Sequence, residues 1–266
     1  MVDRAQVAPR AARKRVVLLG ASNLARGMST VIETARLVWG QPVEIFSALG
    51  HGRSYGLTTT FFGRELPGIV QCGLWRALDA SPPADTYALV TDIGNDLAYG
   101  ASIETTLQWV TTCLDRLAAH QSTITLTALP LASLRELSPR RFQFFQSLFF
   151  PTRKLVLADL LAQAEELDRR LAAIAAERQI RLISQEKAWF LFDPIHIRTA
   201  HWPHAWGAML GPWRDAPQVE LTARSSLRRW LYLRTRAPET RRWWGVEQRC
   251  AQPSGKLPDG TTIALY

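Results

Sequence analysis

The chain has 266 residues, of which 47% are hydrophobic and 21% are charged, with three cysteines and a formal net charge of +9. This composition excludes wholesale disorder, and the length suffices for one large domain or two small ones. The cysteines are too few and too widely spaced for a disulfide framework or a zinc motif, and no apolar run approaches the roughly 18 residues of a membrane helix.

The excess positive charge lies at the two ends of the chain. Residues 1–20 carry five Lys or Arg against one Asp, residues 212–266 carry ten basic against five acidic residues, and the central body is balanced. An anionic partner would therefore contact the ends of the chain. The basic start is followed by only four apolar residues, 16–19, which is too short for the hydrophobic region of a signal peptide, so we expect a cytoplasmic protein.

Segments typical of buried parallel strands alternate with segments typical of helices. The strands are expected at 15–19, 42–49, 86–93 and 122–131, with 179–184 as a weaker fifth candidate. Apolar residues recur at steps of three and four over 103–117 and 157–174, which predicts two amphipathic helices. This alternation indicates βαβ crossovers and therefore an α/β fold with a parallel sheet.

Two segments do not follow the alternation. Residues 138–151 contain five phenylalanines and are expected either to pack on the core or to form a wall or lid over a pocket. From residue 212 the chain is rich in Arg and Trp. Its tryptophans could pack on the body, or the segment could make a weak contact with an anionic surface, nucleic acid or membrane. We divide the chain into a basic arm (1–14), an α/β domain (15–211) and a basic C-terminal extension (212–266).

Polar residues follow the predicted strands, at the edge where open parallel sheets bind ligands. Ser22 follows the first strand, Gly52 the second and Asn95 the third, and Asp193 and His196 lie beyond the last predicted helix. Acyl transfer requires a hydroxyl nucleophile, an imidazole base held by a carboxylate, and hydrogen-bond donors for an oxyanion. We expect the backbone N–H groups of Ser22 and Gly52 and the side-chain amide of Asn95 to be those donors.

Four short blocks, VVLLGASN, ALGHGRS, IGND and DPIH, occur in this order within residues 16–210. In these blocks the sequence resembles the SGNH hydrolases, also called GDSL-type esterases and lipases. The resemblance implies a flavodoxin-like three-layer α/β/α sandwich. It also implies hydrolysis of an ester or acyl group without metal or cofactor, and we expect the substrate to be a small-molecule or glycan ester. The site residues that it implies are Ser22, Gly52 (or Gly50 in its place), Asn95, Asp193 and His196.

The blocks depart from the family pattern at three positions. Ala21 replaces the aspartate of Gly-Asp-Ser, Ile93 replaces the first glycine of Gly-x-Asn-Asp, and Ile197 stands where proline is common. None of these changes removes a proposed catalytic group. The departures indicate a divergent member, so the resemblance does not specify the acyl group or the alcohol.

Several alternatives remain for the same residues. Ser54 lies in a G-x-S-x-G pattern and could be the nucleophile of an α/β-hydrolase. His196, His201 and His204 lie close enough in sequence to be considered as metal ligands, although their spacing matches no defined motif. The protein could also be a binding protein without turnover, or an acyltransferase that uses the same residues.

Overall fold

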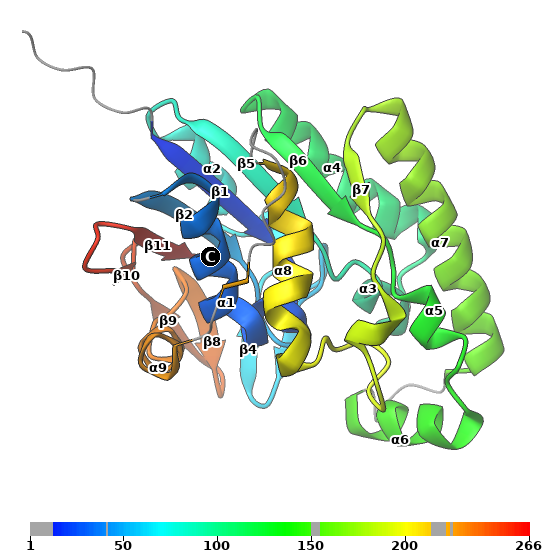
Figure 1. Ribbon diagram of the computed structural model, residues 1–266. Coiled ribbons are helices and arrows are strands. Elements are labelled where there is room, and N and C mark those ends of the chain that lie inside the picture. Colours follow the sequence, from blue (N-terminus) through cyan, green and yellow to red (C-terminus); the bar gives the residue numbers. More distant parts are fainter. Residues whose placement is uncertain (1–12, 41, 150–154, 214–221, 224–225) are drawn as a thin grey trace, which may run out of the picture.

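The computed structural model describes residues 13–40, 42–149, 155–213, 222–223 and 226–266. A seven-stranded sheet forms its centre, in the order β10-β11-β2-β1-β5-β6-β7 (Figure 1). All neighbours in this sheet are parallel except the pair β10 and β11. The strands are β1 (Lys14–Leu19), β2 (Val43–Ala48), β5 (Asp85–Val90), β6 (Thr123–Thr127), β7 (Arg181–Ile183), β10 (Gly255–Lys256) and β11 (Thr262–Leu265).

The five predicted strands are β1, β2, β5, β6 and β7. Their order in the sheet is second, first, third, fourth, fifth, which is the order of flavodoxin-like folds. Such a sheet reverses its winding direction between the first and third strands, here β1 and β5. The prediction of an α/β fold with a central parallel sheet is therefore confirmed, and the reversal marks where a ligand site is expected.

Helices cover both faces of the sheet because the central strands are buried on both sides. In β1, Val17 and Leu19 pack into one core, whereas Val16 and Leu18 pack into the other. The first core is closed by α2 (Leu74–Asp79), α4 (Ile103–Ala119) and α7 (Leu157–Glu177). The second is closed by α1 (Ser22–Trp39), α8 (Trp202–Leu210) and α9 (Leu227–Arg234). This is the expected three-layer sandwich, and α4 and α7 confirm both periodic helices.

Shorter elements surround these layers. The remaining α-helices are α3 (Asn95–Ala98), α5 (Leu131–Leu134) and α6 (Pro139–Phe149). Single turns of 3-10 helix lie at Ile69–Gln71, Lys187–Trp189, Thr199–His201 and Gly211–Trp213. A second, antiparallel sheet has the order β3-β4-β8-β9. Its strands are β3 (Thr59–Phe61), β4 (Arg64–Leu66), β8 (Thr240–Trp243) and β9 (Val246–Arg249).

The C-terminal part of the chain contributes to both sheets. β11 lies between β10 and β2 in the main sheet, and β8 pairs with β4 in the second sheet. Arg242 forms an ion pair with Glu65, while Trp244 is 74% exposed. Residues 1–12, 214–221 and 224–225, which carry part of the predicted basic ends, lie outside the described residues. None of the helices in the described part of the chain combines the length and apolarity needed to cross a membrane.

Candidate active site

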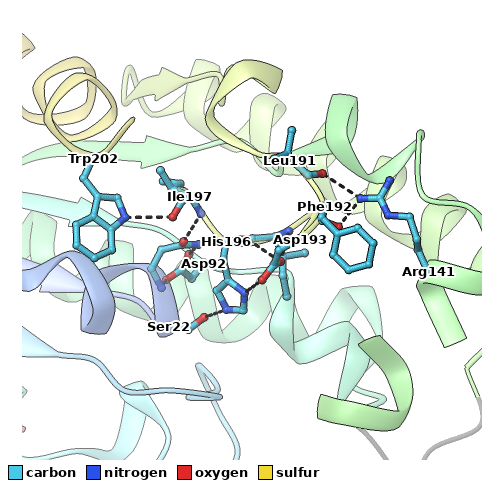
Figure 2. Close-up of polar contacts among 11 residues, drawn as sticks. Ser22, Asp92, Arg141, Leu191, Phe192, Asp193, His196, Ile197 and Trp202 are labelled. Atoms are coloured by element: carbon cyan, nitrogen blue, oxygen red, sulfur yellow. Dashed lines mark hydrogen bonds and ion pairs between the residues drawn. The ribbon is translucent and has the colours of Figure 1, made fainter. Parts of the chain in front are cut away.

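Ser22, His196 and Asp193 form a continuous line of polar contacts beside the carboxyl end of β1 (Figure 2). Ser22 Oγ lies 2.8 Å from His196 Nε2, and His196 Nδ1 lies 2.6 Å from Asp193 Oδ2. Ser22 and His196 are each 9% exposed, so the contact is largely shielded from water. When Nδ1–H donates to the carboxylate, Nε2 is left as an acceptor for the serine proton, which is the arrangement that activates a serine nucleophile.

A tight turn presents Asp193 and His196 together. Asp193 Oδ1 accepts hydrogen bonds from the backbone N–H groups of Ile195 and His196, both at 3.1 Å, and Oδ2 faces the imidazole. Partial burial raises the pKa of Asp193, but the hydrogen bond and charge of His196, together with the two N–H donors, outweigh it and hold that pKa below its ordinary value. The carboxylate is therefore kept ionised, as an orienting group must be.

Asp92, which was not predicted from the sequence, holds the start of α1. Its Oδ2 accepts hydrogen bonds from the N–H groups of Ala21 at 2.8 Å and Asn23 at 3.1 Å, and the Ser22 N–H lies between these two donors in the chain. A carboxylate at a helix N-terminus also interacts favourably with the helix dipole. Asp92 adopts a φ of 60°, a left-handed conformation that few residues other than glycine take. The signal available in the sequence was a charged residue near the end of the otherwise largely apolar segment 86–93.

Asn23, also not predicted, connects the serine turn to the histidine turn. Its Nδ2 donates to Asp92 Oδ1 at 2.8 Å and to the Ile195 carbonyl at 2.9 Å, and its Oδ1 accepts from the Ile197 N–H at 2.8 Å. Ile195 and Ile197 flank His196 on both sides. The Asn23 amide therefore fixes the backbone that carries the imidazole relative to the backbone that carries Ser22.

The glycine and asparagine blocks lie at the same edge of the sheet, because β2, β1 and β5 are neighbours and parallel. Gly52, in the turn after β2, has a φ of 66°, and its carbonyl accepts a hydrogen bond from Tyr99 Oη at 2.6 Å. A Cβ at this position would lie 2.7 Å from the same hydroxyl, so both the backbone and the available space require glycine. Gly50 lacks this left-handed conformation, and its space is limited by Leu66. Asn95 begins α3 and lines a pocket with Ser22.

Ser54 lies in a different environment, which contradicts its assignment as nucleophile. Its side chain is completely buried, and its hydroxyl donates to Asp96 Oδ1 while accepting from the N–H groups of Gly56 and Leu57. Burial raises the pKa of Asp96 to about 6, despite the hydrogen bonds that this carboxylate accepts from Ser54 and Tyr55. The Ser54–Asp96 pair instead ties the glycine turn to α3.

Two of the three histidines considered as metal ligands, His196 and His204, have separate partners. His204 Nε2 lies 3.1 Å from Glu186 Oε1, whereas His196 faces Ser22 and Asp193. Across the described ranges, no group of three or more His, Cys, Asp or Glu side chains is placed to hold a metal ion.

An apolar pocket begins at Ser22 and Asn95 and extends toward α6 and α7. Phe142 and Phe145 of α6 form part of its wall, so the phenylalanine-rich segment is a helix that borders the pocket. Phe144 is 54% exposed on the same helix, whereas Phe150 and the side chain of Phe149 lie outside the described residues.

Comparison with known proteins supports the fold. No family model and no curated protein matches the chain. A carbohydrate acetylesterase family member from Sinorhizobium meliloti is 15% identical, with a TM-score of 0.53 over 75% of this chain and 96% of that one. The native aryl esterase of M. smegmatis is 12% identical, with a TM-score of 0.53 over 75% of this chain and 97% of its own. The predicted resemblance is thus confirmed at the level of the fold.

Proposed function

We propose that this protein is a serine hydrolase that cleaves carboxylic ester or O-acyl groups. The observation that carries the proposal is the Ser22–His196–Asp193 line of contacts at the edge of the sheet between β1 and β5. Solved structures with this fold include proteins named as an acetylesterase and an aryl esterase, which adds support from proteins of low sequence identity.

The first half-reaction acylates the serine. Ser22 Oγ attacks the carbonyl carbon of the ester while its proton passes to His196 Nε2. The negative charge on the carbonyl oxygen is stabilised by the N–H groups of Ser22 and Gly52 and by Asn95 Nδ2, donors that are each worth roughly 2.7 to 4 kcal/mol in comparable sites. The bond to the alcohol then breaks, and His196 returns its proton to the leaving oxygen.

The second half-reaction restores the enzyme. Water gives its proton to His196 and attacks the acyl-serine, the acid is released, and Ser22 recovers its proton from the imidazole. Asp193 remains ionised throughout, holding Nδ1 and stabilising the imidazolium. An acceptor alcohol in place of water would give acyl transfer with the same residues, and product analysis with competing alcohols distinguishes the two reactions.

Labelling with a fluorophosphonate probe, combined with hydrolysis of a panel of p-nitrophenyl esters, tests the proposal. The wild-type protein should label at Ser22, and Ser22→Ala should abolish labelling and lower kcat by roughly 10³-fold or more. Ser29→Ala is the matched control, because Ser29 lies on the same helix, is 1% exposed and contacts the Ser226 carbonyl rather than a histidine. A folded wild-type protein that neither labels nor hydrolyses any ester would favour a binding protein without turnover.

A further inference from the structure

We infer that the pocket beside Ser22 binds an aliphatic acyl chain, so that the preferred substrates are esters of medium-chain acids rather than acetyl esters. This inference rests on the proposed function and specifies which half of the ester the enzyme selects. Its basis is the chemistry of the pocket wall and the position of the pocket relative to the reacting atoms.

The pocket has room for more than an acetyl group and is lined mostly by apolar side chains. Its cavity volume is about 130 Å³ when the open solvent at its mouth is left out, which is room for several water molecules. Beyond Ser22 and Asn95, the wall is built mainly from aliphatic and aromatic side chains of α3, α6, α7 and the segment after β6. The wall includes Ala98, Leu129, Leu137, Phe142, Phe145 and Leu161. An acetyl group would contact only the entrance and leave this surface without a partner.

Three of the polar side chains on the wall make hydrogen bonds within the protein. The Asn23 amide is bound by Asp92 and the histidine turn, as described above. Thr127 Oγ1 donates to Thr91 Oγ1 at 2.8 Å, and Gln185 Nε2 donates to the Ala128 carbonyl at 2.7 Å. Sugar hydroxyls placed here would exchange water for a mostly apolar wall, and each hydroxyl left without a hydrogen-bond partner would weaken binding. An alkyl chain carries no such cost.

The position of the pocket assigns it to the acyl half of the ester. In the proposed reaction, the leaving oxygen must face His196 Nε2, which protonates it, and the carbonyl oxygen must face the N–H and amide donors. Asn95 and Ser22 line the pocket, whereas His196 and Gly52 do not. The remaining substituent of the reacting carbon, the acyl chain, is therefore the one directed into the pocket.

The wall formed by α6 is attached to the turn that carries the catalytic acid and base. Arg141 donates hydrogen bonds to the carbonyls of Leu191 and Phe192, the two residues before Asp193 (Figure 2). Its guanidinium also lies over the Phe192 ring at 5.0 Å, and the Phe145 and Phe192 rings are 5.5 Å apart. These contacts connect the α6 wall of the chain site to the turn that carries Asp193 and His196.

A series of p-nitrophenyl esters from acetyl to dodecanoyl tests the inference with the full-length protein. We expect kcat/KM to rise by up to about fourfold for each added methylene, corresponding to about 0.8 kcal/mol for a fully buried one, and to be at least 100-fold higher for octanoyl than for acetyl before levelling off. A kcat/KM for the acetyl ester equal to or above that for octanoyl would overturn the inference while leaving the proposed hydrolase activity intact.

A variant that fills the pocket provides a second test. Leu161 is half-buried on α7 and lines the pocket, so Leu161→Trp should lower the octanoyl-to-acetyl ratio of kcat/KM at least tenfold. Leu37→Trp, on the exposed face of α1, is the matched control and should keep the wild-type ratio. An unchanged ratio in folded Leu161→Trp would also contradict the inference.

A binding measurement separates failure of the inference from failure of the proposed function. Calorimetry measures the binding of octanoate to Ser22→Ala and requires no turnover. Adding Leu161→Trp should abolish this binding or weaken it at least tenfold. If octanoate binds, but the wild-type protein cleaves no ester and is not labelled at Ser22, the hydrolase proposal fails. The proposed preference among ester substrates then fails with it. If octanoate does not bind, the pocket is not a chain site.

Discussion

Replacing Asp92 by asparagine is the most direct test of how the serine and histidine turns are held together. The hydrogen bonds around Asp92 allow only one polarity: both carboxylate oxygens accept, so the Asn23 amide must direct its Nδ2 toward Asp92 and its Oδ1 toward the Ile197 N–H. If the substituted side chain keeps its oxygen on the backbone donors, its amide NH₂ faces the NH₂ of Asn23. Rotating the Asn23 amide to relieve this contact places its NH₂ against the Ile197 N–H and removes the bond to the Ile195 carbonyl.

The expected effect follows from the number and type of bonds lost. At least one hydrogen bond to a charged group disappears, and such bonds contribute about 1.5–3 kcal/mol each. We therefore expect the free energy of unfolding of Asp92→Asn to fall by about 2 kcal/mol. Displacement of His196 relative to Ser22 should lower kcat/KM roughly 10- to 100-fold, because proton transfer depends steeply on the position of the base.

Urea unfolding and p-nitrophenyl ester kinetics measure the two effects separately. Asp259→Asn is the control, because Asp259 also accepts three hydrogen bonds, from Arg36 and from the N–H and hydroxyl of Thr261, at the opposite end of the sheet. It should lose stability but retain wild-type kcat/KM. If Asp92→Asn retained kcat/KM within twofold of wild type, the Asp92–Asn23 connection would not position the catalytic groups.

Three further predictions concern the glycine turn and α3. Ser54→Ala removes the buried donor to Asp96 and should lower the free energy of unfolding by about 1–3 kcal/mol. Fluorophosphonate labelling of Ser22 should persist in this variant. Loss of labelling in the folded variant would contradict the assignment of Ser22 as the nucleophile. Because burial raises the pKa of Asp96 from 3.8 to about 6, the folded state retains a proton that the unfolded chain has released between these values. The free energy of unfolding contributed by Asp96 should therefore decline by about 2–3 kcal/mol as the pH rises from about 4 to about 6. Urea unfolding of Asp96→Asn should lack this decline. Parallel pH profiles of the wild type and Asp96→Asn would refute the prediction. Gly52→Ala should lower the free energy of unfolding by about 1–2 kcal/mol, because residue 52 has a left-handed backbone, and the resulting shift of the turn should lower kcat at least tenfold. Adding Tyr99→Phe to Gly52→Ala removes the close hydroxyl and should restore part of kcat. Wild-type kcat in Gly52→Ala would contradict the requirement for glycine in this turn.

The sheet and its covering helices were predictable because their signals are local. Central strands buried on both faces appear as apolar runs, and helices that cover them show steps of three and four. Two predicted strands, 86–93 and 122–131, extend beyond the ends of the observed strands β5 and β6. Several of the additional residues belong to the candidate active site or its pocket. Residues 91–93 leave the sheet after β5 and include Asp92, and residues 128–130 follow β6 and form part of the pocket wall. The sequence does not distinguish an apolar residue in a sheet from one that borders a cavity.

The contacts of Asp92 and Asn23 could not be inferred in the same way. The hydrogen bonds that connect the Ser22 turn to Asp92 and to the His196 turn join residues that are 69 to 174 positions apart in the sequence. The left-handed conformation of Asp92 accompanies these long-range bonds and has no local sequence signal. β11 was not predicted for a related reason. It is a four-residue strand in a turn-rich segment, and only its parallel pairing with β2, more than two hundred residues earlier, makes it part of the main sheet.

The placement of β11 and β10 also determines which backbone groups the main sheet leaves open to other molecules. The outermost strands are β7, with three residues, and β10, with two, so each border presents few free amide and carbonyl groups. β2 has six residues and is shielded on that side by β11. Removing residues 255–266 would leave the six residues of β2 as an unpaired edge, to which strands of other chains can add, so we expect this removal to promote self-association.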